Sequence, residues 1–178
     1  MNKKICVIIG HGGNDCGAVN PTNKGTELAY NEKLAPRVAD ILTINGYKAD
    51  IYNRGYRKVE DIAHLNRQKY DLIISLHCNS YDSKVSGTEM LFWHKSKNSE
   101  KLAECLQKEI VGVFQLNDRK IKPIKKGDRG WYLLYSTNAP CVILEPFFID
   151  NDSDYHLGLE RQESYANAIV KGINKYFE

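Results

Sequence analysis

Residues 4–13 read Lys-Ile-Cys-Val-Ile-Ile-Gly-His-Gly-Gly, an apolar run that ends in a histidine among glycines. Residues 4–9 are the length of one strand, and five of these six residues are apolar. A short continuous apolar run of this kind is typical of a strand that is buried on both faces of a parallel sheet. Residues 71–76 and 141–144 form two further runs of the same type. The three runs predict the centre of a sheet.

Helical patterns lie between and after these runs. In residues 26–44 apolar side chains recur at helical spacing, and Asn45-Gly46 ends the pattern. Further helices are expected at residues 59–68, 99–116 and 162–177, and further strands at residues 47–52 and 88–93. The alternation in residues 88–93 favours an edge strand. Strands that alternate with helices predict a single α/β domain, with a mostly parallel twisted sheet and helices on both faces.

The length and net charge of the chain limit the kinds of partner that it can be expected to bind. The chain has 178 residues, enough for one domain with its own core, and its net charge is only +3. Acidic residues nearly balance the basic ones, so we expect no nucleic-acid partner. The densest basic stretch is residues 119–129, which reads either as a solvated loop or as a contact with an anionic polymer.

Cysteines and termini give expectations about the compartment. The five cysteines are odd in number and include no CxxC pair, so reduced thiols in a cytoplasm are the simpler interpretation. The apolar run at the N-terminus is too short for the core of a signal peptide. No apolar run approaches the ~20 residues of a membrane span. We therefore expect no export signal and no membrane span.

Ionisable residues follow the buried strands directly. His11, His77 and Glu145 each come at the end of one apolar run, and Glu27 stands at the predicted start of the first long helix. The carboxyl ends of parallel strands meet at one edge of a sheet, which is where α/β proteins bind their ligands. We expect these four side chains to gather at that edge.

Two histidines and two carboxylates suit a hydrolytic zinc site. Such a site uses three protein ligands and keeps one position open for water, while a further carboxylate serves as general base and acid. Each residue alone has a plainer interpretation. A histidine at a strand end is commonly a hydrogen-bonded residue, Glu27 would favour the helix N-terminus, and Glu145 could form a salt bridge. The glycines near His11 could also cradle a phosphate, although no GxGxxG motif is present.

Ordered motifs along nearly the whole chain resemble the zinc-dependent N-acetylmuramoyl-L-alanine amidases of bacterial autolysins and phage endolysins. The matching segments are Gly-His-Gly-Gly-Asn-Asp-Cys-Gly-Ala (10–18), Glu27, Asp-Leu-Ile-Ile-Ser-Leu-His-Cys-Asn (71–79), Gly-Thr-Glu (87–89) and Leu-Glu-Pro-Phe-Phe-Ile-Asp-Asn (144–151). One difference is Pro146-Phe147, which replaces a commoner Thr-Gly after the last glutamate and leads us to expect a reshaped substrate groove.

The resemblance implies a specific chemistry. His11, Glu27 and His77 would bind Zn2+, and Glu145 would be the catalytic carboxylate. Asn79 and Glu89 would lie near the site. The substrate would be bacterial peptidoglycan, cut at the amide between N-acetylmuramic acid and L-alanine.

The resemblance also implies where the protein works. Residues 1–178 would form a catalytic domain that is a monomer in isolation, and a separate wall-binding domain would lie outside this chain. The protein would be made in the cytoplasm of a bacterial host and would act on the cell wall after release. Three alternatives stay open: a zinc peptidase acting on the stem peptide, a wall-binding module without activity, and a nucleotide-binding α/β protein.

Overall fold

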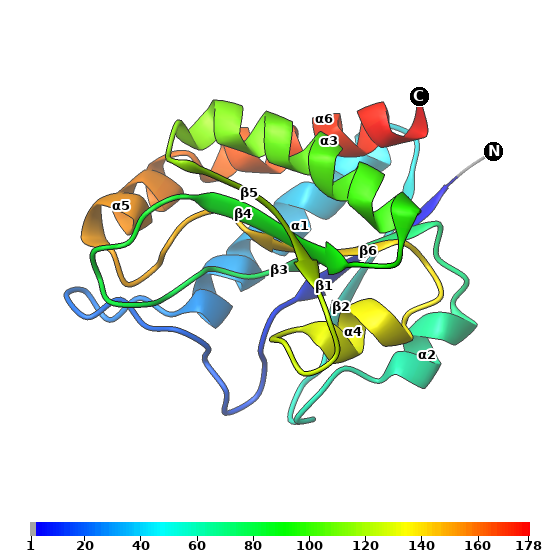
Figure 1. The fold of residues 1–178 in the computed structure, drawn as a ribbon, viewed down its shortest axis with the longest axis horizontal. Coiled ribbons are helices and arrows are strands. Elements are labelled where there is room, and N and C mark those ends of the chain that lie inside the picture. The colour runs from blue at the N-terminus through cyan, green and yellow to red at the C-terminus, as the bar shows by residue number, and fades with distance from the viewer. Residues whose placement is uncertain (1–2) are drawn as a thin grey trace.

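Six strands form one sheet through the middle of residues 3–178, the part of the chain that the computed structural model describes (Figure 1). The strands are β1 (Lys4–Ile9), β2 (Lys48–Asn53), β3 (Leu72–Leu76), β4 (Thr88–Trp93), β5 (Asp118–Ile124) and β6 (Cys141–Glu145). Their order across the sheet is β2-β1-β3-β6-β4-β5. The first four of these run parallel, and β4 pairs with β6 antiparallel. The predicted fold class, a mostly parallel α/β sheet, is confirmed.

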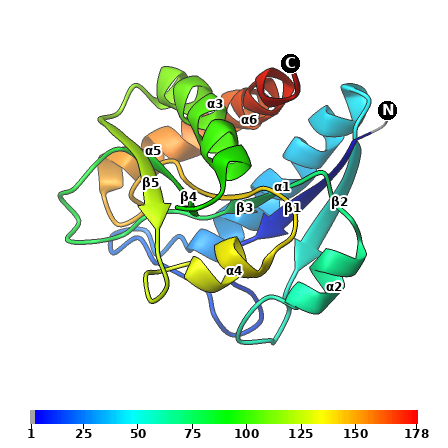
Figure 2. The ribbon, with the colours of Figure 1, turned by 45° about the vertical axis from the view of Figure 1, so that its right-hand side comes forward.

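Helices cover both faces of this sheet. They are α1 (Glu27–Ile44), α2 (Ile62–Arg67), α3 (Lys97–Phe114), α4 (Trp131–Ser136), α5 (Asp152–Glu160) and α6 (Gln162–Phe177). Figure 2 shows α1, α3 and α6 on one face and the short helices α2 and α4 on the other. The larger hydrophobic core lies under the three long helices because each of them buries an apolar stripe against the sheet. Within residues 3–178, none of the helices has the length and hydropathy needed to cross a bilayer.

The start of α1 is fixed by local hydrogen bonds. The side chain of Thr26 accepts a hydrogen bond from the Ala29 amide at 3.2 Å, which is the usual way to cap a helix N-terminus. One turn further on, the buried Asn31 donates to the carbonyl of Leu76 at 3.1 Å. This bond ties the second turn of α1 to the last residue of β3. Glu27 is therefore held beside the carboxyl ends of the strands.

The far side of the sheet differs from the sequence prediction. β4 is not an edge strand, because β5 pairs with it in parallel and forms the edge itself. Of residues 119–129, which the sequence left open as a loop or a contact with an anionic polymer, residues 119–124 belong to this strand and residues 125–129 form a loop. β5 reads Asp-Arg-Lys-Ile-Lys-Pro-Ile, and its charges and Pro123 hide the strand pattern. Charged side chains and proline are what edge strands use to avoid pairing with other chains.

Candidate functional site

Parallel strands bring the predicted site residues to one edge of the sheet. His11 follows β1, His77 follows β3 directly, and Glu145 is the last residue of β6. The strand ends are level, because Ile9 is paired with Leu76 and Leu76 is paired with Leu144. The four side chains named from the sequence line one pocket of about 380 Å³.

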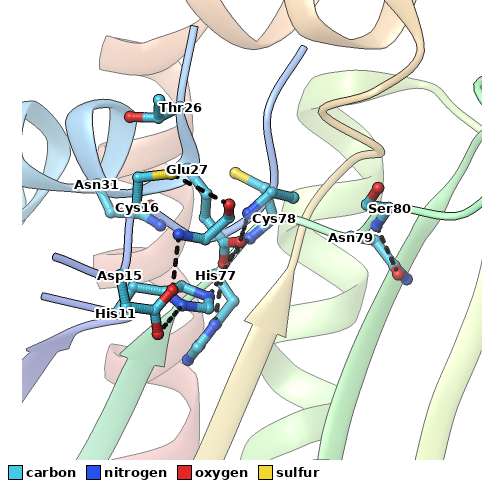
Figure 3. A network of polar contacts seen from close by, with 12 residues as sticks. His11, Asp15, Cys16, Thr26, Glu27, Asn31, His77, Cys78, Asn79 and Ser80 are labelled. Atoms are coloured by element: carbon cyan, nitrogen blue, oxygen red, sulfur yellow. Dashed lines mark hydrogen bonds and ion pairs between the residues drawn. The ribbon is translucent and has the colours of Figure 1, made fainter. Parts of the chain in front are cut away.

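His11, Glu27 and His77 make a compact cluster (Figure 3). Glu27 is 3% exposed, and its two oxygens lie 3.1 Å from Nε2 of His11 and 2.9 Å from Nδ1 of His77. One donor atom from each of the three residues lies within 4.8 Å of the others. Two imidazole nitrogens and one carboxylate oxygen are a ligand set that zinc accepts.

Charge is concentrated in this cluster. Burial alone would raise the pKa of Glu27, but hydrogen bonds from His11 and His77 hold that pKa far below its usual value. Burial likewise opposes charge on His11, and the hydrogen bonds to Glu27 and Asp15 outweigh it, raising the pKa of His11 to about 9. The cluster thus holds an ionised carboxylate between two imidazoles. A metal ion would take the place of a proton on such imidazoles, because only the neutral ring is a ligand.

Further groups orient the cluster. Asp15 lies 3.0 Å from Nδ1 of His11, and Arg54 pairs with the same carboxylate. Glu27 also accepts hydrogen bonds from the amides of Ala18 at 3.1 Å and Cys78 at 2.9 Å. Carboxylates that hold metal-binding histidines in this way fix the ring orientation and raise the basicity of the ligand. The arrangement therefore fits a metal ion.

Two glycines leave room for the cluster. A Cβ at Gly10 would lie 2.6 Å from the His77 ring. A Cβ at Gly17, where φ is +68°, would lie 2.7 Å from both Glu27 and His11. Neither position can carry a larger residue without moving a member of the cluster.

Glu145 lines the same pocket and is also buried. It is 5% exposed, and its Oε1 is 3.1 Å from Arg129. Among the described residues, its buried Oε2 has no hydrogen-bond partner. Burial raises the pKa of Glu145 to about 7, although the positive charge of Arg129 acts in the opposite direction. A carboxylate with this pKa and one free oxygen can accept and return a proton near neutral pH.

Two arginines that the sequence did not single out complete the site. Arg129 donates to Asn79 at 3.1 Å and to Glu89 at 2.6 Å, while Arg119 donates to Glu89 at 2.7 Å. Asn79 donates to Glu89 at 2.9 Å, so the residues expected near the site do form a network beside it. Both arginines belong to the basic stretch 119–129, where nothing in the sequence separates them from the neighbouring lysines.

Pro146 and Phe147 do not line the pocket that holds the four predicted site residues. Phe147 is fully buried in the larger core, where its ring packs edge-on against Tyr30 with centroids 5.1 Å apart. The Pro146 carbonyl accepts a hydrogen bond from Thr88 at 2.7 Å. These residues anchor the end of β6 rather than shape the pocket.

Comparisons with known proteins cover almost the whole chain. Residues 5–175 match the family described as N-acetylmuramoyl-L-alanine amidase (Amidase_3). The germination-specific N-acetylmuramoyl-L-alanine amidase of Bacillus subtilis (strain 168) is 32% identical, with 98% of this chain and 80% of the relative covered. The endolysin of Bacillus phage SPP1 is 28% identical, with 97% of this chain and 64% of the endolysin covered.

Solved structures give the same result. The catalytic domain of the CD27L endolysin, which targets Clostridia difficile, superposes with a TM-score of 0.84 at 29% identity and covers 98% of both chains. The catalytic domain of CwlV, an N-acetylmuramoyl-L-alanine amidase of Bacillus (Paenibacillus) polymyxa, superposes with a TM-score of 0.84 at 26% identity and also covers 98% of both chains. The similarity to catalytic domains extends over the full sheet and the strand ends that form the pocket.

Proposed function

The chain belongs to the N-acetylmuramoyl-L-alanine amidase family, and from that premise we propose that it is a zinc-dependent hydrolase of bacterial peptidoglycan. The bond cut is the amide between N-acetylmuramic acid and L-alanine. The observation that carries the proposal is the convergence of His11, Glu27 and His77 within 4.8 Å, in a pocket that Glu145 also lines. Residues 1–178 act as the catalytic domain, working as a monomer on the cell wall after synthesis in the host cytoplasm.

Each residue of the site has its own role in the proposed reaction. His11, Glu27 and His77 would hold the zinc ion, and Asp15 keeps the His11 ring in the orientation needed to bind it. When bound, zinc would supply Lewis-acid chemistry, which polarises a carbonyl and lowers the pKa of water. Glu145 takes the proton from the attacking water at its free Oε2 and then gives it to the leaving amine of L-alanine. Arg129 orients Glu145 and favours its ionised form.

Digestion of purified peptidoglycan tests this proposal directly. We expect the protein to release new L-alanine amino termini, detected by mass spectrometry, and to lose this activity when a chelator removes the metal. Added Zn2+ should restore it. New amino termini inside the stem peptide would instead indicate a peptidase, and zinc-independent release would contradict the metal assignment.

The pH dependence tests the role of Glu145 and its partner Arg129. Since the base must be ionised, kcat/KM should fall about tenfold per pH unit on the acid side of its pKa, which lies at or below about 7. The variant Arg129→Gln removes a positive charge from the carboxylate, so the acid limb should move to higher pH. The matched variant Arg37→Gln changes an exposed arginine whose partner is Glu163, and its profile should equal that of the wild type. An unchanged limb in Arg129→Gln would contradict the proposed coupling.

A further inference from the structure

A second pocket, of about 490 Å³, lies beside α4 and contains none of the residues of the His-Glu cluster. Its lining combines three aromatic rings with three lysines and one histidine: Trp93, Trp131, Tyr135, Lys95, Lys125, Lys126 and His94. We call this surface the aromatic pocket. The proposed reaction uses none of these side chains, so their arrangement needs a separate explanation.

The rings of the aromatic pocket lie side by side, with Trp93 and Trp131 partly buried against the smaller core and Tyr135 exposed. Tyr135 is 59% exposed, although it lies next to two tryptophans. Its ring centroid is 5.0 Å from that of Trp93 and 6.2 Å from that of Trp131. Contiguous apolar patches of this kind on a protein surface mark binding sites. Aromatic rings also offer flat faces to the C–H groups on one side of a sugar ring, while the sugar hydroxyls stay hydrated.

Charge in the aromatic pocket has one sign. Within residues 3–178, Lys95, Lys125 and Lys126 form no salt bridge, and no acidic side chain lines the pocket. The ammonium of Lys126 lies 6.0 Å from the centre of the Trp131 ring. The three lysine ammonium groups therefore line the same pocket as aromatic rings, whose flat faces suit the uncharged face of a sugar. The combination matches a saccharide whose substituents carry carboxylates.

The short helix α4 lies between the aromatic pocket and the pocket that contains Glu145 and the His-Glu cluster. We call the latter the catalytic pocket. Gly130 and Leu133 line the catalytic pocket, whereas Trp131 and Tyr135 line the aromatic one. The two pockets therefore lie on opposite flanks of one short helix. An α-helix with its side chains is roughly 10–12 Å wide, so one small molecule cannot fill both pockets, but a polymer can.

We propose that the aromatic pocket binds sugar residues of the same glycan strand whose muramoyl amide is cut next to Glu145. This inference rests on the proposed function. The rings bind the faces of the sugars, and the lysines bind the carboxylates of neighbouring stem peptides. It also assigns Lys125 and Lys126 of the basic stretch to an anionic polymer. The pocket makes the enzyme prefer a long strand to a single muramoyl peptide.

Steady-state kinetics on two substrates test this inference. One substrate is a soluble, uncrosslinked glycan strand that carries stem peptides, and the other is a single disaccharide with one stem peptide. Replacement of Tyr135 by alanine should raise KM for the strand about tenfold, the equivalent of one lost contact of about 1.4 kcal/mol. It should leave kcat and KM for the short substrate unchanged. Tyr135→Phe keeps the ring and should behave as the wild type.

The matched control lies on the same helix. Tyr132 is 45% exposed and does not line the aromatic pocket, so Tyr132→Ala removes a similar ring without the proposed contact. Equal KM values for Tyr135→Ala and wild type on the strand would overturn the inference, as would equal losses on both substrates. Binding of a phosphate-rich wall polymer that is lost in Lys125→Ala but kept in Tyr135→Ala would also overturn it, in favour of a polyanion site. Absence of cleavage of either substrate by the wild type would instead contradict the proposed function, and co-sedimentation with the strand would then test the pocket by itself.

Discussion

Replacement of Glu145 by glutamine is expected to lower kcat by about 10²–10⁴-fold, the usual contribution of general acid–base catalysis. Glutamine keeps the shape of the side chain and can still contact Arg129, but it cannot accept the proton that the free Oε2 receives. Zinc content should stay at the wild-type level because Glu145 is not one of the clustered donors. The measurement is turnover of peptidoglycan together with metal analysis of the purified variant.

The same substitution should stabilise the metal-free protein. Folding raises the pKa of Glu145 from 4.5 to about 7, so the unfolded chain binds fewer protons between these values and stability falls as pH rises through that window. A neutral glutamine removes this penalty, which amounts to about 3 kcal/mol above pH 7 at about 1.4 kcal/mol per pKa unit. A higher midpoint of denaturation with lost turnover is a result that simple misfolding cannot produce.

An exposed glutamate provides the control for both measurements. Glu104 lies on the exposed face of α3, so Glu104→Gln makes the same chemical change away from the pocket. It should change neither turnover nor stability. Wild-type turnover in Glu145→Gln would show that Glu145 takes no part in the reaction. The general base would then have to be another residue.

Residues at strand ends were predictable because the geometry of a parallel sheet leaves little freedom. An apolar strand that ends in His11 and another that ends in His77 must deliver both side chains to one edge once the strands are parallel and level. Glu27 was predictable for a related reason, since the helix after β1 returns across the sheet and starts near the same edge. Local pattern and topology agree at these positions.

Residues that act through long side chains were not predictable. Arg129 reaches Glu145 and Glu89 from a loop whose lysines and arginines look alike in the sequence. Arg54 is paired with Asp15 across 39 positions of the chain, and no periodic pattern marks such a contact. β5 was missed because the alternation of an edge strand is masked by its own charges. Contacts of this kind depend on tertiary packing. The order and type of the neighbouring residues carry no information about the distances that packing creates.

Replacement of His77 by alanine is expected to weaken zinc binding by well over 100-fold. Partners that merely orient the ligands of a metal contribute about 10–100-fold, and His77 is itself one of the three clustered donors. Without His77, Glu27 keeps only His11 as its imidazole partner. Metal analysis after gel filtration and competition with a chelator would measure the loss.

The matched variant is His156→Ala, which removes an exposed histidine on α5 and should keep full zinc content. Far-UV circular dichroism should show that both variants fold. If His77 acts as a ligand, turnover of His77→Ala should rise again when free Zn2+ is increased, since mass action compensates for weak binding. A variant with wild-type zinc content but no turnover would instead place His77 among the groups that contact substrate, and the assignment of His77 as a metal ligand would be wrong. The zinc titration therefore separates a histidine that holds the metal from one that only lies near it.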